Sequence, residues 1–377
     1  MSEATIDPER QKQAKTYARI NQRLMLVELL IGAGYSLAWL VFGWSQAVAD
    51  SLLNYTSNDW ILVAVFAAIF GGIYFLITLP ISYYSGFVLP HRFNLSNQNL
   101  TGWLGDLAKG LLVSAVLGGL LIEIIYAVLR LSPDWWWLWV AAILLVFSVL
   151  LANLAPILLL PIFYKFVPLG EEHAELVERL LRLAERAHTR VRGVFKFDLS
   201  RRTKAANAAL TGLGNTRRII LGDTLINEFS TDEIETVLAH ELAHQVHRDI
   251  PIGIAVESAM TLIGLYLASL GMRWGVAYFG FSGPADVAAM PLLVAVVGVY
   301  GLVTMPLGNA FSRWRERRAD EYAVRATGNG AAYASALARL ANQNLADAEP
   351  EAWVELLLYS HPALNKRIAM AHALSKK

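Results

Sequence analysis

The sequence predicts a mainly α-helical membrane protein, in which about six spanning helices form a bundle and carry polar segments on one face of the bilayer. The composition supports this prediction, because 55% of the 377 residues are hydrophobic and only 17% are charged. An ordinary soluble protein is less apolar than this. Six apolar runs also reach about 20 residues, the length that a helix needs to cross a bilayer. Core helices of a large soluble protein are the alternative, but they do not require runs of this length.

The predicted spans form two groups. Four come first, at 24–44, 60–79, 111–131 and 135–158, and two follow at 252–270 and 287–307. The chain then divides into an N-terminal segment (1–23), four spans (24–160), a central polar segment (161–250), two spans (251–310) and a C-terminal polar segment (311–377). Small residues near Ala47 resemble a signal-peptide cleavage site. The apolar stretch before them is too long and its polar lead too extended, so we expect an uncleaved anchor.

Lysine and arginine residues are divided unequally between the loops. The N-terminal segment holds five, the loop at 90–110 two, the central polar stretch thirteen and the C-terminal segment ten. The alternate loops hold none at 48–59 and only Arg130 and Arg273 at the other two positions. Because positively charged loops remain in the cytoplasm, we expect a multi-pass protein of the inner (cytoplasmic) membrane. Both termini and both polar segments should face the cytoplasm.

The composition also excludes several kinds of site. The chain has no cysteine, so disulfides, thiolate zinc sites and cysteine nucleophiles are all excluded. Any metal must be held by histidine and carboxylate. The net charge of +1 provides no basic field for nucleic acid, which we do not expect as a partner.

The central polar segment contains the motif His-Glu-x-x-His. Residues 230–233, Ser-Thr-Asp-Glu, predict a capping box that begins a helix. On that helix His240 and His244 lie one turn apart on one face, so both imidazoles can point at one metal ion. Glu241 lies beside them and could take a proton from a water molecule whose pKa zinc lowers to near 7. The alternative is a surface helix with unrelated histidines, but the motif arises by chance in roughly one such chain in a hundred.

A catalytic zinc site needs a third protein ligand and an open fourth position. After the sixth span, Glu316 and Asp320 are four residues apart on a predicted helix and share a face. Glu316 could be the third ligand, and Asp320 could accept a hydrogen bond from a ligand histidine. The spacing leaves another interpretation open, a solvated helix whose acids pair with its arginines, Arg313, Arg317 and Arg318.

The combination of motifs resembles the type I CAAX prenyl proteases, which are integral-membrane zinc metallopeptidases. His-Glu-x-x-His is followed, after about seventy residues with two predicted spans, by Ser-Arg-x-x-Glu-x-x-Ala-Asp. Further similar stretches are PHRFNLSNQNLTGWLGDLAKG at 90–110, APILLLPIFYKFVPL at 155–169, KAANAALTGLGNTRRIILGDTLI at 204–226 and SHPALNKRI at 360–368. The chain departs from the family at Tyr164, where asparagine is usual, and at Ala209 and Leu210, which replace aromatic residues. It also has six predicted spans where eukaryotic members have seven.

The resemblance implies a fold and a set of roles. The fold is a ring of helices around a chamber, with a cytoplasmic zincin-like metalloprotease domain that contains a small β-sheet. The implied zinc ligands are His240, His244 and Glu316, with Glu241 as general base and Asp320 in support of the ligands.

The resemblance also implies how substrate is bound. Asn207 and Ala208 would pair with an extended substrate as an added strand. His361 and Arg367 would lie near the oxyanion, where a donor stabilises the charge that develops in the reaction. From the sequence alone, His361 is more typical of a turn residue before proline.

These inferences predict a membrane zinc endopeptidase that cleaves extended, prenylated or membrane-associated polypeptides. Within the same class, a heat-shock-type quality-control metalloprotease shares the zinc motif but usually has fewer spans. An alternative from another class is a six-span transporter or pore with a structural zinc site. A structural site normally has four protein ligands, whereas two histidines and a glutamate leave one position open.

Overall fold

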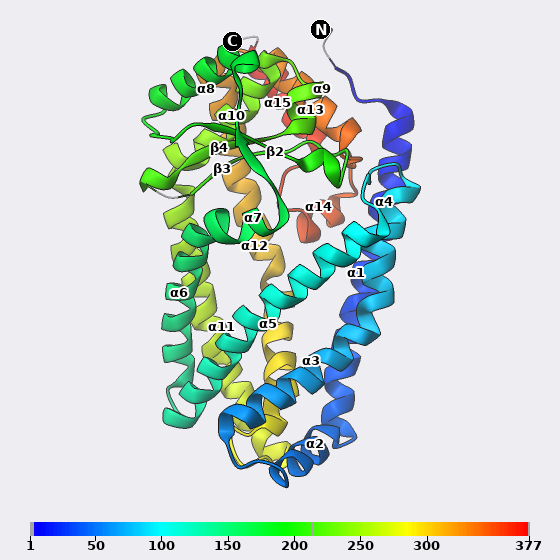
Figure 1. The fold of residues 1–377 in the computed structure, drawn as a ribbon, viewed down its shortest axis with the longest axis vertical. Helices are drawn as coiled ribbons and strands as arrows, with labels where there is room; N and C mark the ends of the chain where they lie inside the picture. The colour runs from blue at the N-terminus through cyan, green and yellow to red at the C-terminus, as the bar shows by residue number, and fades with distance from the viewer. Residues whose placement is uncertain (1–3, 213, 376–377) are drawn as a thin grey trace.

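The structure is a computed structural model that describes residues 4–212 and 214–375 of the chain. It is mostly helical and elongated, and it has two parts (Figure 1). Long helices fill one part, which we call the bundle. The sheet and the shorter helices form a cap at one end of the bundle, and both ends of the chain lie at this cap.

Six helices in the described part of the chain are long and apolar enough to cross a membrane, which confirms the predicted bundle. They extend over Pro8–Val41, Asp59–Arg92, Leu100–Leu131, Trp136–Phe163, Asp249–Phe279 and Val287–Thr327. Their lengths are 28 to 41 residues, more than the roughly 20 that a bilayer requires. They therefore continue beyond the membrane toward the cap.

Some of these long helices consist of several elements. The bundle elements are α1 (Pro8–Val41), α2 (Trp44–Leu53), α3 (Asp59–Tyr83), α4 (Leu89–Arg92), α5 (Leu100–Leu131), α6 (Trp136–Leu154), α7 (Leu160–Phe163), α11 (Asp249–Phe279) and α12 (Met290–Thr327). Short π-helical turns join α3 to α4 at Tyr84–Val88 and α6 to α7 at Ala155–Leu159. In both cases a proline is the second residue after the turn, Pro90 and Pro161. A proline cannot donate a helical hydrogen bond, so these turns mark weakened points of the helices.

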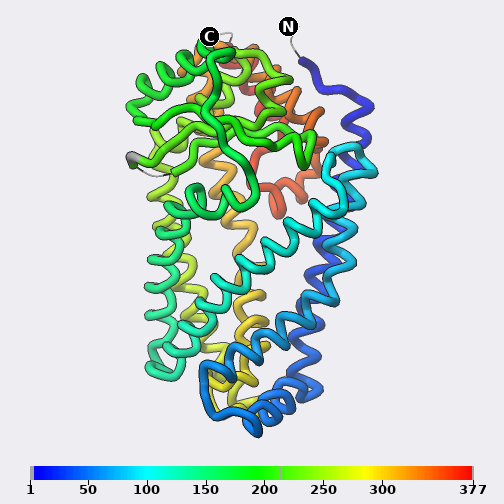
Figure 2. The backbone as a smooth tube through the Cα atoms, viewed as in Figure 1, coloured from blue at the N-terminus to red at the C-terminus, as the bar shows by residue number. Residues whose placement is uncertain are grey.

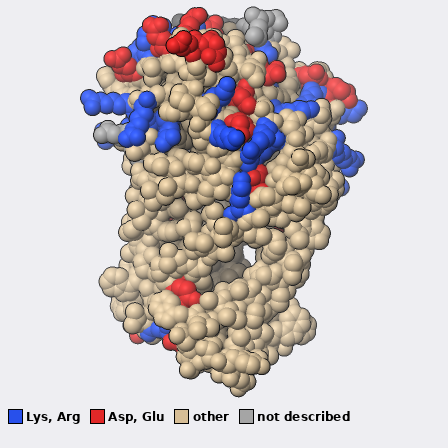
Figure 3. Space-filling view, in the orientation of Figure 1, with Lys and Arg blue, Asp and Glu red and all other residues tan. Residues whose placement is uncertain are grey.

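The surface of the bundle is apolar, as a lipid-facing surface must be. Leu30, Leu112 and Val303 are each more than 60% exposed, which water would not favour but hydrocarbon would. Lysine, arginine, aspartate and glutamate gather over the cap, and a broad uncharged belt lies below them (Figure 3). The same view shows an opening between the helices that leads into the interior of the bundle. The bundle is therefore hollow, in agreement with the chamber that the resemblance implies.

The bundle is closed at the end opposite the cap by an apolar cluster. Its members come from the six long helices, from α2 and from the turn after α11, and they include the large side chains of Trp39, Phe66, Phe70, Tyr126, Trp136, Met272 and Phe281. Trp39 packs edge-on against Phe66 and Phe70, with ring centroids 5.9 and 5.1 Å apart. Aromatic pairs of this geometry stabilise packing beyond simple burial. The path of the backbone in Figure 2 shows the helices meeting at this end.

The cap contains a four-stranded mixed sheet, which confirms the predicted small β-sheet. The strands are β1 (Phe166–Pro168), β2 (Val194–Phe197), β3 (Ala208–Thr211) and β4 (Arg218–Gly222), in the order β1-β2-β4-β3. β2 and β4 are parallel, and the other two pairs are antiparallel. β3 is thus an edge strand.

Six helices complete the cap around the sheet. They are α8 (Ala174–Arg186), α9 (Asp223–Glu228), α10 (Thr231–Val246), α13 (Gly330–Gln343), α14 (Ala352–Leu358) and α15 (Leu364–Ser375). α8 is amphipathic: Leu176, Leu180, Leu183 and Ala184 are buried at the spacing of one helix face, as expected of a helix that covers a core. α10 is the central element and packs against β3, α8, α12 and α13.

An ion pair fixes the bundle to the segment that precedes β3. Arg202 holds Asp106 of α5 with two hydrogen bonds, Nε to Oδ2 at 2.6 Å and Nη2 to Oδ1 at 2.7 Å. The two side chains are only 12% and 23% exposed, and the guanidinium lies 4.6 Å from the Tyr164 ring centroid. The main chain adds hydrogen bonds from Asn97 N to Arg202 O and from Lys204 N to Leu95 O. A bidentate pair of this kind provides geometric precision as well as energy.

We predict that Arg202→Ala destabilises the protein by about 2 kcal/mol, because it leaves a half-buried carboxylate without its charged donor. The thermal unfolding midpoint of the detergent-solubilised protein measures this effect. Arg201→Ala is the matched control, since Arg201 is 52% exposed and lies 3.6 Å from Asp198. Its loss should cost less than about 0.5 kcal/mol. Equal midpoints for the two variants would contradict the role given to the Arg202 pair.

Candidate active site

The predicted capping box is present and begins α10. Ser230 Oγ accepts from Glu233 N at 3.3 Å, and Glu233 Oε2 accepts from Ser230 N at 2.8 Å. Glu233 is buried and also accepts from Ser335 Oγ at 2.6 Å and Arg339 Nε at 3.2 Å. The start of α10 is therefore fixed to α13 as well as to its own backbone.

Two faces of α10 have different surroundings. Leu238, Ala239 and Leu242 are fully buried in the core of the cap. His240 and His244 are on another face, next to α12, and their ring centroids are 5.2 Å apart. Burial of the apolar face thus fixes the direction in which the imidazoles point.

Three side chains converge to form a group that could hold a metal ion. One ligand atom from each of His240, His244 and Glu316 lies within 4.8 Å of the others. His240 Nε2 is 3.2 Å from Glu316 Oε2, and His244 Nε2 is 3.6 Å from Glu316 Oε1. Within the part of the chain that the structure describes, Glu316 Oε2 is buried and makes no hydrogen bond. Buried polar atoms seldom lack a partner, so this donor set fits a divalent metal ion with one position left open.

Carboxylates hold the other ring nitrogen of each histidine. His240 Nδ1 is 3.0 Å from Asp320 Oδ1, and His244 Nδ1 is 2.8 Å from Asp249 Oδ2. Each carboxylate favours the tautomer that carries its proton on Nδ1, which leaves Nε2 with a lone pair facing Glu316. Asp320 thus lies where one of the two interpretations of its helical spacing placed it, beside a histidine ring nitrogen.

Asp320 is itself held by two further groups. Arg367 donates Nε to Oδ2 at 2.9 Å and Nη2 to Oδ1 at 2.6 Å, and the Tyr333 hydroxyl donates to Oδ1 at 2.6 Å. Burial raises the pKa of Tyr333 well above its usual value of 10, so this hydroxyl keeps its proton and remains a donor. Hydrogen bonds therefore connect Arg367 to Asp320 and Asp320 to His240. A buried network in which every member has a partner is rigid.

Glu241 follows His240 on α10. Both residues line a cavity beside the ligand group, which is described below. Burial raises the pKa of its carboxyl group, while the nearby His240 and His244 act in the opposite direction. The Leu210 main chain also forms a hydrogen bond with it that lowers the pKa. This contact brings the carboxylate to the edge of β3.

His361 approaches the same group from the C-terminal segment. Its Nε2 is 3.3 Å from Glu316 Oε2, and its side chain is 55% exposed. The loop that carries it is fixed by Arg313, which donates Nη1 to Glu355 O at 2.9 Å and to Tyr359 O at 2.6 Å. Since Arg313 and Glu316 are both on α12, one helix positions the carboxylate and the loop of His361 together.

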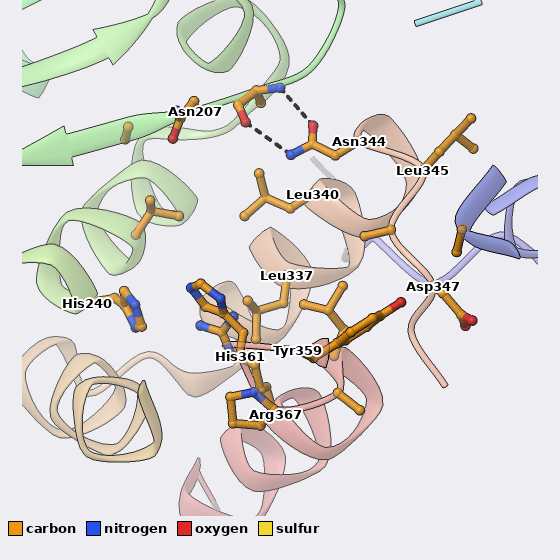
Figure 4. A pocket seen from close by; sticks show the side chains of 18 of the residues that line it. Asn207, His240, Leu337, Leu340, Asn344, Leu345, Asp347, Tyr359, His361 and Arg367 are labelled. Atoms are coloured by element: carbon orange, nitrogen blue, oxygen red, sulfur yellow. Dashed lines mark hydrogen bonds between the residues drawn. The ribbon is translucent and has the colours of Figure 1, made fainter. Parts of the chain in front are cut away.

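A cavity of about 540 Å³ adjoins these residues. Figure 4 shows His240 and His361 on one side of this cavity, Asn344 on another, and Leu337 and Leu340 between them. Its wall also includes Tyr17 and Asn21 of α1 and the stretch 206–208 before and in β3. The cavity is largely apolar and opens beside Glu241, as expected of a binding site for a peptide side chain.

The two predicted strand residues differ in their surroundings. The Asn207 carbonyl accepts a hydrogen bond from Gly222 N at 2.8 Å, so its main chain is turned toward β4. Ala208 pairs with Leu221 in register but, by the alternation of antiparallel strands, directs its N–H and C=O to the free edge. The side chain of Asn207 lines the cavity.

Two residues of this site were not predicted from the sequence. Asp249 is five residues after His244 and directly precedes an apolar span. An acidic residue at the start of a span is a candidate functional residue, so the sequence did contain a signal for Asp249. Tyr333 had no such signal, because it lies on a helix with an ordinary amphipathic pattern. Only the packing of α13 on α10 brings it to His240.

Comparison with known proteins agrees with this geometry. A family model described as "Peptidase family M48" matches residues 171–375, more than half of the chain. The chain belongs to peptidase family M48. A second model, described as "CAAX prenyl protease N-terminal, five membrane helices", matches residues 2–165. Four of the helices in that range are long and apolar enough to span a membrane here.

Several relatives cover most of the chain. The "Uncharacterized metalloprotease YhfN" of Bacillus subtilis is 28% identical over 95% of this chain and 84% of its own length. CAAX prenyl protease 1 of Saccharomyces cerevisiae is 29% identical over 80% of this chain and 70% of its own length. The fold matches the crystal structure of S. mikatae Ste24p with a TM-score of 0.87, at 24% identity, over 98% of this chain and 92% of that one.

These matches confirm the family predicted from the motifs. The chain is an integral-membrane metalloprotease, and membership of M48 implies a metal cofactor. The heat-shock-type protease and the transporter with a structural metal site are not favoured.

We predict that His244→Ala loses the bound metal, because two ligands cannot retain an ion that needs three. Elemental analysis of the purified protein measures this loss. Asp249→Asn should weaken metal affinity by about 10- to 100-fold, since it disturbs the orientation of His244. His247→Ala, one turn further along the chain, is the control and should keep its metal. Undiminished metal in His244→Ala would refute the assignment.

Proposed function

We propose that this protein is a zinc endopeptidase whose ligands are His240, His244 and Glu316. One observation carries the proposal: the Nε2 atoms of His240 and His244 face the two oxygens of the Glu316 carboxylate, while each Nδ1 is held by a carboxylate. Two imidazoles and one carboxylate, in a chain without cysteine, are a donor set that suits zinc. A bound zinc ion would supply Lewis-acid chemistry, which polarises a carbonyl and acidifies a water molecule.

The side chains of this site divide the work of hydrolysis. Glu241 takes a proton from the attacking water and passes it to the leaving amine, for which its raised pKa is suitable. Asp320 and Asp249 hold the ligand imidazoles in one orientation throughout. Because these groups are already in place, the site needs no rearrangement during the reaction. Such preorganisation is a main source of transition-state stabilisation in enzymes.

His361 is proposed as the donor to the developing oxyanion. Its exposed imidazole lies at the open side of the ligand group and can reach a substrate carbonyl there. Arg367 is bound to Asp320 through two of its nitrogens. We therefore assign Arg367 mainly a positioning role toward Asp320, with its positive charge adding to the field at the oxyanion.

The proposed substrate is an extended polypeptide, added as a strand to the free edge of β3 at Ala208. Edge strands bind extended peptides through main-chain hydrogen bonds, with side-chain pockets for specificity. Asn207 contributes its side chain to the wall of the cavity. The hollow bundle and the relatives named CAAX prenyl proteases support membrane-associated or prenylated polypeptides as natural substrates.

Glu241→Gln should lower the rate of peptide cleavage by about 10²- to 10⁴-fold, because the amide cannot accept a proton at neutral pH. Cleavage of a quenched fluorescent peptide measures this rate in detergent. Metal content should stay at the wild-type level, since Glu241 is not a ligand. Wild-type cleavage by this variant would exclude the proposed mechanism.

His361→Ala tests the oxyanion assignment separately. Turnover should fall while the metal content and KM change little, because the proposed contact forms only in the transition state. His372→Ala is the control, since it removes an exposed imidazole on α15. A His361→Ala variant with unchanged kcat would remove His361 from the mechanism.

We also propose that the cap faces the cytoplasm, because lysine and arginine are concentrated in it. Single cysteines in this cysteine-free chain can test the orientation. In intact cells, a membrane-impermeant maleimide should label Tyr55→Cys, in the loop between α2 and α3, but not Glu172→Cys or Arg325→Cys. All three positions have exposed side chains. Labelling of either cap position from outside would reverse the topology.

A further inference from the structure

The main chain that leads into β3 is held at successive residues by groups from other elements. Lys204 O accepts from Gln343 Nε2 at 2.7 Å, and Ala205 O accepts from Thr224 Oγ1 at 2.8 Å. Asn344 then holds both groups of Ala206: its Oδ1 accepts from Ala206 N at 2.9 Å, and its Nδ2 donates to Ala206 O at 3.2 Å. Asn207 O accepts from Gly222 N.

The contact at Ala206 lies on the edge of the sheet that substrate would use. In an antiparallel pair, successive residues direct their N–H and C=O alternately toward the partner strand and away from it. Asn207 is turned toward β4 through its bond with Gly222. Ala208 is therefore turned to the free edge. Ala206, two residues before β3, has its N–H and C=O turned to Asn344 instead of β4. The carboxamide of Asn344 forms with Ala206 the two hydrogen bonds that a neighbouring strand would form (Figure 4).

The end of α13 is built in an unusual way that presents this side chain. Asn344 is the C-cap residue of α13, and Ala346 N bonds back to Ala341 O at 3.0 Å. Leu345 between them has a φ of 48°. This left-handed conformation is normally left to glycine at the end of a helix. Leu345 is nevertheless 2% exposed and packs with Ala14 and Leu95. A strained residue that is held by packing often accompanies a functional constraint.

We propose that Asn344 is a positioning residue that ends the free edge of β3 at Ala206, so that substrate pairing begins at Ala208. This inference rests on the proposed function, because it assumes that substrate binds as an added strand. The Asn344 carboxamide occupies the position on the edge that one more substrate residue would take. Asn344 thereby fixes the direction of the β3 main chain and the register in which the peptide pairs with it.

The proposal has a consequence for the path of the substrate. A peptide that pairs at Ala208 cannot continue along the edge past Ala206 and must leave the sheet there. The space beside it is the cavity lined by Leu337, Leu340 and Tyr359, together with Leu345. Register determines which peptide bond lies beside Glu241, because a slip of one residue would present the other face of the strand.

Asn344→Ala tests the proposal, and Asn342→Ala is its matched control. Asn342 lies on the same helix and also clamps a main chain with two hydrogen bonds, from Asp7 N and to Thr5 O, each 2.9 Å long. It holds the N-terminal segment instead of the sheet edge. Both full-length variants, loaded with zinc, are compared with wild type on one quenched fluorescent peptide of about twelve residues. KM, kcat and the cleaved bonds are determined, the last by mass spectrometry.

For Asn344→Ala we expect KM to rise about tenfold with kcat within about twofold of wild type, since two hydrogen bonds that align the binding edge are lost before chemistry begins. We expect cleavage to spread to at least one additional bond, because the edge is now open at Ala206. Asn342→Ala should keep the wild-type KM and cleavage site.

Other outcomes would overturn the inference in distinguishable ways. Asn344→Ala with wild-type KM and a single cleavage site would show that the contact does not position substrate. A fall in kcat alone, matched by Asn342→Ala, would show that both asparagines serve only stability. A wild-type protein that binds zinc but cleaves no peptide would instead refute the proposed function itself.

Discussion

The structure depends on one requirement: two imidazoles one turn apart must present their Nε2 atoms to the same point. Each is held by a carboxylate on its other nitrogen, Asp320 for His240 and Asp249 for His244. Neither carboxylate comes from α10. One is on α12 and the other is the first residue of α11, so the site forms only when the cap and the bundle are assembled together. The network of Arg367 and Tyr333 then extends this constraint to α13 and α15.

The same logic explains why the sheet lies where it does. α10 packs on β3, which brings the edge strand next to Glu241. The segment before β3 is fixed at one end to the bundle through Arg202 and Asp106 and at the other to α13 through Asn344. Catalytic groups and the binding edge are thus positioned by the same few helices, and little of the site depends on free loops.

Much of this architecture could be predicted from the sequence, because the signals were local. Six apolar runs, a capping box and the one-turn spacing within the pairs His240/His244 and Glu316/Asp320 can each be recognised within a short stretch of sequence. The resemblance to the family's motifs was needed to bring the two pairs together in one site. The family's motifs then supplied His361. The ends of the spans were less predictable. Helix α1 begins at Pro8, after the N-cap Asp7, and so starts well before the apolar run at 24–44. Hydropathy identifies only the lipid-facing part of a helix, not its first residue. The roles of Tyr333 and Asn344, and the direction of the Asn207 main chain, depend on tertiary packing, which no local pattern encodes.

The position of Asp249, Glu316 and Asp320 on α11 and α12 has a mechanical consequence. Both helices are long enough to cross the bilayer and to reach the ligand group without a break. A helix that is longer than the hydrocarbon layer responds to a thinner or thicker membrane by tilting. The far ends of these helices are held in the apolar cluster opposite the cap, so a tilt becomes a displacement at the cap end. A change in membrane thickness is therefore expected to shift Asp320 and Asp249, the carboxylates that orient His240 and His244.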